Sequence, residues 1–112
     1  MAYKLVIDNK ITTKVKGFYR DEKGVSRPFS FDLSQDRVTQ EELKELVSDG
    51  GSTPDFIRRV THGWKGQRLV LDDNDQPAEF CAEALDVLLS VSGMGSYCYQ
   101  AYVSQVLVTE KN

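Results

Sequence analysis

The sequence is poor in the side chains that most often carry out chemistry. It contains one histidine, two cysteines and one tryptophan in 112 residues. A thiolate–imidazole pair could be built only from His62 with Cys81 or Cys98, and no nucleophile motif surrounds either cysteine. Both cysteines lie in apolar patterns typical of helices, so we expect reduced, buried core residues without a disulfide. The sequence therefore predicts no enzyme and no catalytic residue.

Long apolar runs and an excess of positive charge are also missing. No run approaches the roughly 20 residues that a transmembrane helix needs, and residues 1–8 do not contain the apolar core of a signal peptide. The formal net charge of −3 argues against nucleic acid or a membrane surface as the partner of the whole chain. We therefore expect a cytosolic protein that does not bind membranes.

Motifs for metal ions and phosphates are incomplete. The acidic stretch Asp72–Gln76 offers clustered oxygen atoms but lacks the central glycine and the distal glutamate of an EF-hand loop. Gly93–Ser96 is a short glycine-rich turn that no lysine follows, unlike a phosphate-binding loop. A polar turn before a helix explains the acidic stretch without an ion, so we expect no metal and no cofactor.

Length and patterning favour one α+β domain that spans residues 1–112. Residues 1–35 are strand-rich and are expected to form a small antiparallel sheet, made of a hairpin and a further strand. Residues 36–112 are mostly helical in pattern and are expected to place three to four helices on that sheet.

The strands of the sheet are marked by short apolar and alternating runs. A strand is expected over Tyr3–Asp8, and a hairpin over Val15–Arg20 and Val25–Leu33, with Gly24 supplying a positive φ at the end of the turn. Pro28 cannot donate to a strand ladder, so the second hairpin strand is expected to lie at an edge there.

Two helices are expected next. Thr39 and Glu42 have the spacing of a capping box, and Gly50–Gly51 is expected to end the first helix. A second helix is expected to begin at residues 52–53 and to stop at Gly63, which would place the histidine at a helix C-terminus.

The remaining segments are less regular. Residues 67–76 indicate a short strand or extended stretch that ends in a turn, after which Asp75 is expected to cap a helix opened by Pro77. The apolar residues of that helix repeat at helical spacing: Phe80, Ala84, Val87, Leu88 and Val91. Residues 96–109 fit a helix only moderately and are rich in tyrosine and valine, so helix and strand stay open there.

Four aromatic residues are candidates for partner binding. Trp64 lies between two glycines, which suits either a core residue at a chain crossing or an exposed anchor for a partner. Tyr97, Tyr99 and Tyr102 cannot all face one way on a helix, so at least one must be exposed or lie at an interface.

Charge is distributed unevenly along the chain. Residues 1–35 hold seven Lys/Arg and four Asp/Glu, whereas residues 69–112 hold one Lys and seven Asp/Glu. This polarity suits head-to-tail self-association or simply two solvated faces. The basic residues near Phe18 and Tyr19 suit either a strand-borne nucleic-acid surface or an edge strand protected by cations; they are Lys10, Lys14, Lys16, Arg20, Lys23 and Arg27.

Several short motifs together resemble the tail assembly chaperones of long-tailed bacteriophages. In that family, a Gly-Trp near mid-chain is followed by an acidic turn that ends in proline, a phenylalanine and a leucine-rich helix. The matching residues are Gly63-Trp64, Asp73–Pro77, Phe80, and Leu85, Leu88 and Leu89, after an entry from Phe31–Leu33 into Thr39–Leu43. Gln76 stands where the family's turn usually carries glycine, and the strand-rich first part is longer than usual.

The resemblance implies an α+β fold with helices on one side of a small sheet, and a role without catalysis. Such proteins coat the hydrophobic helices of the tape-measure protein, help to recruit tail-tube subunits, and tend to self-associate. They act in the cytoplasm of the bacterial host and are not kept in the finished virion. The family commonly makes a longer product by ribosomal frameshifting, for which Glu110–Asn112 could be encoded by a slippery GAA-AAA-AAC. The alternative function is a small nucleic-acid-binding regulatory protein that uses the basic strands.

Overall fold

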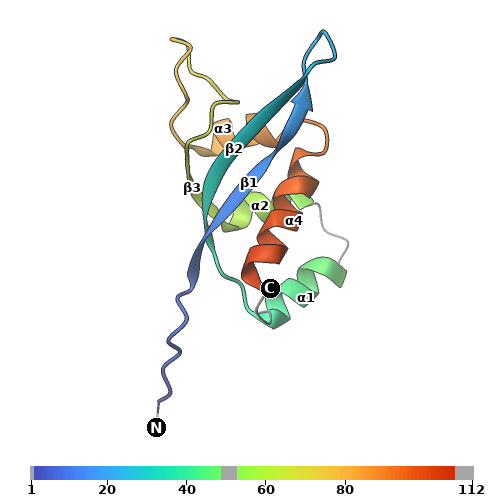
Figure 1. Ribbon diagram of the computed structural model, residues 1–112. Helices are drawn as coiled ribbons and strands as arrows, with labels where there is room; N and C mark the ends of the chain where they lie inside the picture. The colour runs from blue at the N-terminus through green and yellow to red at the C-terminus, as the bar shows by residue number, and fades with distance from the viewer. Residues whose placement is uncertain (1, 49–52, 108–112) are drawn as a thin grey trace.

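The computed structural model describes residues 2–48 and 53–107 (Figure 1). In chain order the elements are β1 (Lys10–Arg20), β2 (Ser26–Asp36), α1 (Gln40–Ser48), α2 (Thr53–Val60), β3 (Thr61–Lys65), α3 (Ala82–Leu89) and α4 (Met94–Val106). The strands form one antiparallel sheet in the order β1-β2-β3. The predicted α+β class, with a small sheet and helices packed on it, is confirmed.

The hairpin of β1 and β2 is confirmed and is longer than its apolar pattern predicted. Its register runs from Lys10 opposite Asp36 to Arg20 opposite Ser26. The turn is closed by the Asp21 carboxylate, which accepts hydrogen bonds from two main-chain N–H groups of the turn at 2.9 and 3.0 Å. Gly24 has the expected positive φ of 79°, a conformation that costs glycine little.

Pro28 lies where the sequence predicted an open edge. It pairs with Phe18 of β1 on one side, while on the other side β3 pairs only with Asp32–Gln35. The distal part of β2 is therefore unpaired on that side, and a residue without an N–H costs no ladder bond there.

The strand predicted over Tyr3–Asp8 is wrong. Residues 2–8 form an irregular arm that extends away from the body at the end opposite the hairpin turn (Figure 1). The segment has strand-forming side chains, but none of the described strands lies beside it, and an extended segment without a hydrogen-bonded neighbour gains little stability.

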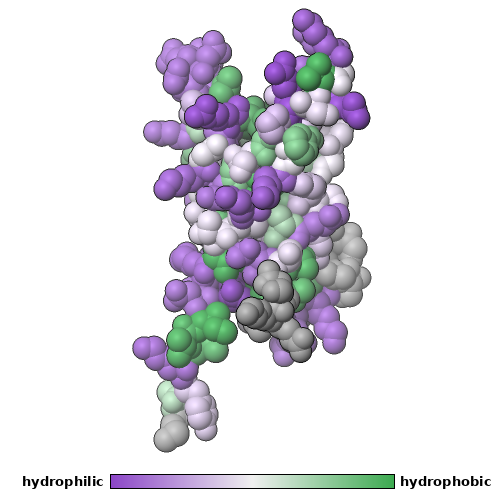
Figure 2. All heavy atoms as spheres, in the orientation of Figure 1, coloured by the Kyte–Doolittle hydropathy of each residue, from purple (hydrophilic) through white to green (hydrophobic). Residues whose placement is uncertain are grey.

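One face of the sheet carries the core. Val15, Phe31 and Leu33 point from the hairpin toward the helices and are at most 3% exposed. The helices cover only this face, so the other face of the sheet is solvated (Figure 1). Seen from that other side, the surface is dominated by hydrophilic residues (Figure 2). The buried residues of the helices complete the core: Phe56, Ile57, Val60, Ala84, Leu85, Leu88, Leu89, Met94, Cys98, Tyr102 and Val106.

The second predicted helix ends earlier than expected. α2 stops at Val60, and the next residue begins β3, so His62 and Gly63 lie on a strand rather than at a helix end. The reason is pairing with β2: the buried Thr61 accepts a 2.9 Å hydrogen bond from Gln35, and Trp64 lies opposite Leu33. These cross-strand contacts outweigh the local helix signal.

The third predicted helix begins later than expected, and Asp75 does not cap it. Pro77 instead pairs with Leu71 in an isolated bridge, with the predicted turn between them, and Asp75 adopts a positive φ of 60° within that turn. α3 starts at Ala82 and is capped by the sulfur of Cys81. Because it serves as this cap, Cys81 is exposed rather than in the core as predicted.

The apolar stripe of α3 is also shifted. Its buried residues are Ala84, Leu85, Leu88 and Leu89, whereas Val87 and Val91 of the predicted stripe are 56% and 48% exposed. The later start of the helix places the pairs 84–85 and 88–89 toward the core. Val91 lies beyond the helix, in the turn that leads to α4.

The open choice for residues 96–109 is resolved as helix up to Val106. The buried side chains of α4 recur every four residues, a helical spacing, at Met94, Cys98, Tyr102 and Val106, and Gly95 is buried beside the first of them. The capping box of the first helix is confirmed by the Thr39 hydroxyl, which accepts from the Glu42 N–H at 3.1 Å. The predicted helix stop at Gly50–Gly51, a cap at Ser52 and the segment Glu110–Asn112 lie outside the described residues.

Candidate functional site

An apolar groove lies at the hairpin end of the molecule. It is bounded on one side by the distal parts of β1 and β2, and on the other by the α3–α4 turn and the first turns of α4. Its volume is about 890 Å³. Six apolar or aromatic residues give it its character: Phe18, Tyr19, Phe29, Val91, Met94 and Tyr97.

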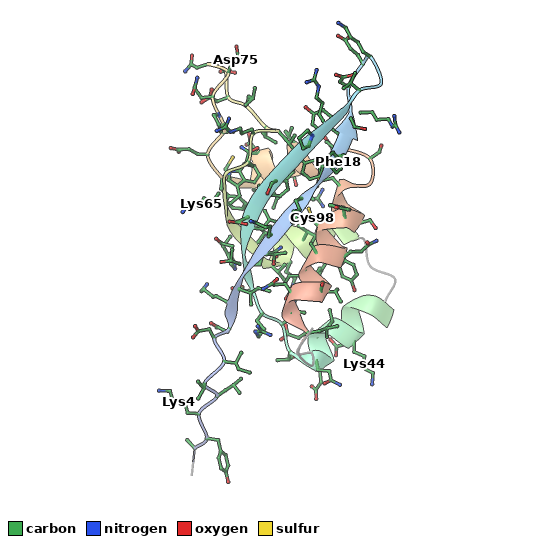
Figure 3. All side chains as sticks on the ribbon, in the orientation of Figure 1. Lys4, Phe18, Lys44, Lys65, Asp75 and Cys98 are labelled. Carbon is green, nitrogen blue, oxygen red and sulfur yellow. The ribbon has the colours of Figure 1, made fainter. Side chains whose placement is uncertain are left out.

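The groove exists because the hairpin is longer than the helical layer beneath it. Phe18 is 74% exposed because strand alternation places its side chain on the face opposite the buried Val15, and it lies near the hairpin end of β1 (Figure 3). Val91 forms the facing wall and is about half exposed. Lys16 and Arg20 also line the groove and add positive charge to it. Contiguous exposed apolar side chains of this kind mark interaction sites.

Tyr97 joins the two walls of the groove. Its hydroxyl donates a hydrogen bond to the Lys16 carbonyl of β1, and its ring meets Phe29 edge-on, with centroids 6.1 Å apart. A Cβ atom at Gly17 would lie 2.9 Å from the Tyr97 hydroxyl oxygen and 3.1 Å from the Phe29 ring. Glycine at this position therefore allows α4 to approach β1 closely.

Substitution of Gly17 by alanine is expected to displace Tyr97 and to lower the free energy of unfolding by about 1–3 kcal/mol, the usual cost of overpacking. Gly63→Ala is a matched control within the same sheet, because its Cβ would meet Ser34 at an ordinary 3.7 Å. The control is expected to be neutral or stabilising by up to about 1 kcal/mol. Urea denaturation of both variants measures the difference, and equal stabilities would contradict this account of Gly17.

The other two candidate tyrosines do not share the groove. Tyr99 is half-buried and packs edge-on against Phe56, with ring centroids 5.5 Å apart. Tyr102 is fully buried, and its hydroxyl donates to the Asp36 carbonyl at 2.7 Å. Burial raises the pKa of this hydroxyl above its ordinary value. Tyr102 is therefore a core residue, and of the three tyrosines only Tyr97 lines the apolar groove.

Trp64 is half-buried and anchors the loop that follows β3. Its ring meets Phe80 edge-on at 5.3 Å, and its indole N–H donates to the Ala78 carbonyl at 3.1 Å. Of the alternatives left open by the sequence, this geometry corresponds to a packed residue at a chain crossing. Trp64 does not line the groove that contains Tyr97.

A second, polar pocket contains the single histidine. His62 contacts the Asp36 carboxylate at 2.6 Å, and Lys10 donates to the same carboxylate at 3.4 Å. Neither cysteine lines this pocket. Burial raises the pKa of the Cys98 thiol to about 12, so this thiol is protonated at neutral pH and is a poor nucleophile. The structure thus does not assemble a thiolate–imidazole pair in this pocket.

The carboxylate of Asp36 makes stability depend on pH. The hydrogen bond to His62, followed by the charges of His62 and Lys10, holds the pKa of Asp36 below its ordinary value of 3.8. A carboxylate with a lowered pKa in the folded state stabilises the fold above its unfolded pKa, and that contribution is lost as pH falls through the folded pKa. We expect Asp36→Asn to flatten the fall in stability below about pH 4, as measured by urea denaturation from pH 7 to 2. An unchanged acid profile would contradict this role.

On the outer face of the sheet, the basic residues of the strands lie beside acidic residues. Asp32 lies opposite Lys14 on one side and opposite Lys65 on the other, and Asp36 lies beside Lys10 and His62. Because acidic and basic side chains alternate, this face has a weaker positive electrostatic potential with which to attract a phosphate backbone.

The acidic turn is explained by its own main chain. The Asp72 carboxylate accepts from the N–H groups of Asn74 and Gln76 at 2.8 and 3.0 Å. Over residues 2–48 and 53–107, no three His, Cys, Asp or Glu side chains gather into a group that could hold a metal ion. None of the helices described is both long and apolar enough to cross a bilayer.

Searches against protein-family models, curated proteins and solved structures found no match to this chain.

Proposed function

We propose that this protein is a non-enzymatic tail assembly chaperone of a long-tailed bacteriophage. It binds apolar helical segments of the tape-measure protein and helps to recruit tail-tube subunits in the cytoplasm of the bacterial host, and it is not retained in the virion. The observation that carries the proposal is the apolar groove at the hairpin end, which is exposed and has no partner within the described residues. The resemblance of Gly63-Trp64 and the acidic turn to that family supplies the particular partners.

The groove suits an amphipathic helix as its ligand. A helix places apolar residues on one face at intervals of three and four, and such a face is recognised by a hydrophobic groove. Phe18 and Tyr97 supply aromatic surface from opposite walls, and Lys16 and Arg20 can bond to carboxylates on the polar side of the helix. Burial of apolar surface contributes about 25 cal/mol per Å², and ordering costs offset much of it. Binding is therefore reversible, as a chaperone requires.

Co-expression with the tape-measure protein of a long-tailed bacteriophage tests the proposal. The wild-type chain is expected to keep the tape-measure protein in the soluble fraction. Val91→Asp, which places a charge in the groove, is expected to abolish this effect. Val87→Asp is the matched control, because Val87 is also exposed and lies outside the groove. The proposal would be contradicted if the wild-type chain did not increase the solubility of the tape-measure protein. It would also be contradicted if Val91→Asp and Val87→Asp changed that solubility equally.

The alternative, a nucleic-acid-binding regulator, predicts a different result. Nucleic-acid binding through the lysines of β1 would weaken steeply as salt is added. Lys14 lies on the solvated face and outside the groove, so Lys14→Glu would abolish such binding. We expect no salt-sensitive binding to DNA or RNA in a fluorescence anisotropy titration. A salt-sensitive affinity that Lys14→Glu removes would favour the alternative.

A further inference from the structure

The arm of residues 2–8 is an apolar segment that no other described part of the chain covers. Tyr3, Leu5 and Val6 are 92%, 75% and 90% exposed. Hydrophobic residues of the arm gather below the sheet (Figure 2), and its Lys4 lies at the opposite end of the molecule from Phe18 (Figure 3). Several neighbouring apolar side chains in water mark a surface that another molecule covers.

The arm has the pattern of a strand that lacks its neighbour. In an extended chain, Tyr3, Leu5 and Ile7 project to one side, while Lys4 and Asp8 project to the other with Val6. The β-branched and aromatic composition favours a strand. The side of Tyr3, Leu5 and Ile7 is wholly apolar, so an acceptor must offer both free main-chain groups and an apolar wall.

The groove at the hairpin end offers an apolar wall and the edge-facing main-chain groups of Phe18 and Arg20, while the Lys16 carbonyl is taken by the Tyr97 hydroxyl. β1 is an edge strand of the sheet, and the groove runs beside its last five residues, Lys16–Arg20. An extended peptide laid along such an edge forms main-chain hydrogen bonds, while alternate side chains enter apolar pockets. Residues 3–7 and 16–20 each span about 17 Å at strand spacing. The Tyr97 and Val91 wall then faces the apolar side of the arm.

The arm cannot reach the groove of its own chain. The ladder of the hairpin continues to Asn9, whose carbonyl accepts from the Arg37 N–H at 2.7 Å, so the arm leaves the sheet away from the hairpin turn. If the chain reversed sharply at residues 8–9, residue 7 would face residue 10 in an antiparallel pair, and Tyr3 would face about Lys14. The groove begins at Lys16, beyond that reach.

We propose that the arm of one copy adds as a strand to the β1 edge of a second copy and fills its apolar groove. The contact is heterologous, because arm and groove are different surfaces at opposite ends of the chain. Copies therefore join head to tail into open chains, or into rings if the rotation closes. The inference goes beyond the proposed function and holds whatever else the groove binds. A tape-measure helix and the arm of a neighbour compete for the same surface.

Sedimentation of the full-length chain and two variants tests the contact. The wild-type chain is expected to show an average mass that rises with concentration to at least double that of the monomer. Leu5→Asp disrupts the arm and Val91→Asp disrupts the groove, so each variant alone is expected to stay monomeric. Val87→Asp, exposed but outside both surfaces, is expected to assemble like the wild type. Circular dichroism confirms that each variant is folded.

Mixing the two disrupted variants gives the sharpest result. The Val91→Asp chain has an intact arm and the Leu5→Asp chain has an intact groove, so an equimolar mixture is expected to form dimers and nothing larger. Even a contact with a Kd of about 1 mM would raise the average mass at a chain concentration of about 1 mM, so a wild type that stays monomeric at this concentration overturns the proposal. So does a mixture that stays monomeric, or a Leu5→Asp chain that still assembles.

This test separates the contact from the proposed function. The Leu5→Asp chain keeps its groove, so it is expected to solubilise a tape-measure protein at least as well as the wild type. Assembly without solubilisation would contradict only the chaperone proposal, and solubilisation without assembly would contradict only the arm contact.

Discussion

Tyr102→Ala is expected to lower the free energy of unfolding by about 3–5 kcal/mol, a large part of the 5–15 kcal/mol typical of a domain. Tyr102 is fully buried and its ring meets Phe56 edge-on at 5.1 Å. Its hydroxyl also joins α4 to the end of β2, where it donates to the Asp36 carbonyl and accepts from the Val38 N–H at 3.1 Å. The substitution thus removes both a core ring and a link between layers.

Tyr102→Phe separates these two contributions. It keeps the ring and removes the two hydrogen bonds, which is expected to cost about 1–3 kcal/mol because the main-chain groups are left without partners. Urea denaturation measures both variants. A loss below about 1 kcal/mol for the alanine variant would show that Tyr102 is not a core residue, and would return it to the candidate partner-binding residues.

Gln67→Leu is expected to lower the free energy of unfolding by about 3 kcal/mol or more. The Gln67 side chain is 2% exposed and makes four hydrogen bonds to the loop that follows β3. Its oxygen accepts from Leu69 and Val70 at 3.0 and 2.8 Å, and its nitrogen donates to the carbonyls of Val70 and Ala78 at 2.9 and 3.2 Å. Leucine satisfies none of these, and each buried main-chain group left unpaired costs about 1–3 kcal/mol.

Gln76→Leu provides the matched control for this loop. It makes the same chemical change at an exposed position whose turn is held by main-chain and Asp72 contacts. A change within about 0.5 kcal/mol is expected there. If thermal or urea denaturation showed similar losses for the two variants, Gln67 would not be the organising residue of the loop.

Local signals in the sequence predicted the parts of the fold that depend on neighbouring residues. The Asp21–Gly24 turn and the Thr39–Glu42 capping box involve side chains that bond within four residues of themselves. Such features need no knowledge of the rest of the chain.

Elements that depend on distant partners were predicted less well. β3 lies where a helix was expected to continue, because Thr61 pairs with Gln35 and Trp64 with Leu33, both far earlier in the sequence. The arm was predicted as a strand because its composition is strand-like, but no strand within residues 2–48 and 53–107 lies beside it. In both cases tertiary pairing, rather than propensity, decides the structure.

The groove could not be predicted from the sequence, because it too depends on contacts between distant parts of the chain. Tyr97 was identified as a candidate contact residue. Phe18 and Tyr19 were noted only beside the basic residues, and Val91 was assigned to the core-facing stripe of a helix. Their proximity follows from the close approach of α4 to β1 at Gly17. The available signal was the long hairpin, whose distal strands have no apolar segment of matching length to cover them.

A hydrogen-exchange footprint measures whether the groove binds apolar helical segments. Amide exchange would be measured for the Leu5→Asp chain, free and bound to a soluble fragment of the tape-measure protein, so that the arm of a neighbouring copy does not mask the result. Binding in the groove predicts slower exchange in residues 16–20 and 91–97 of the complex, with little change in residues 61–65 of β3. Protection confined to β3 and the outer face of the sheet, with an unchanged groove, would contradict it.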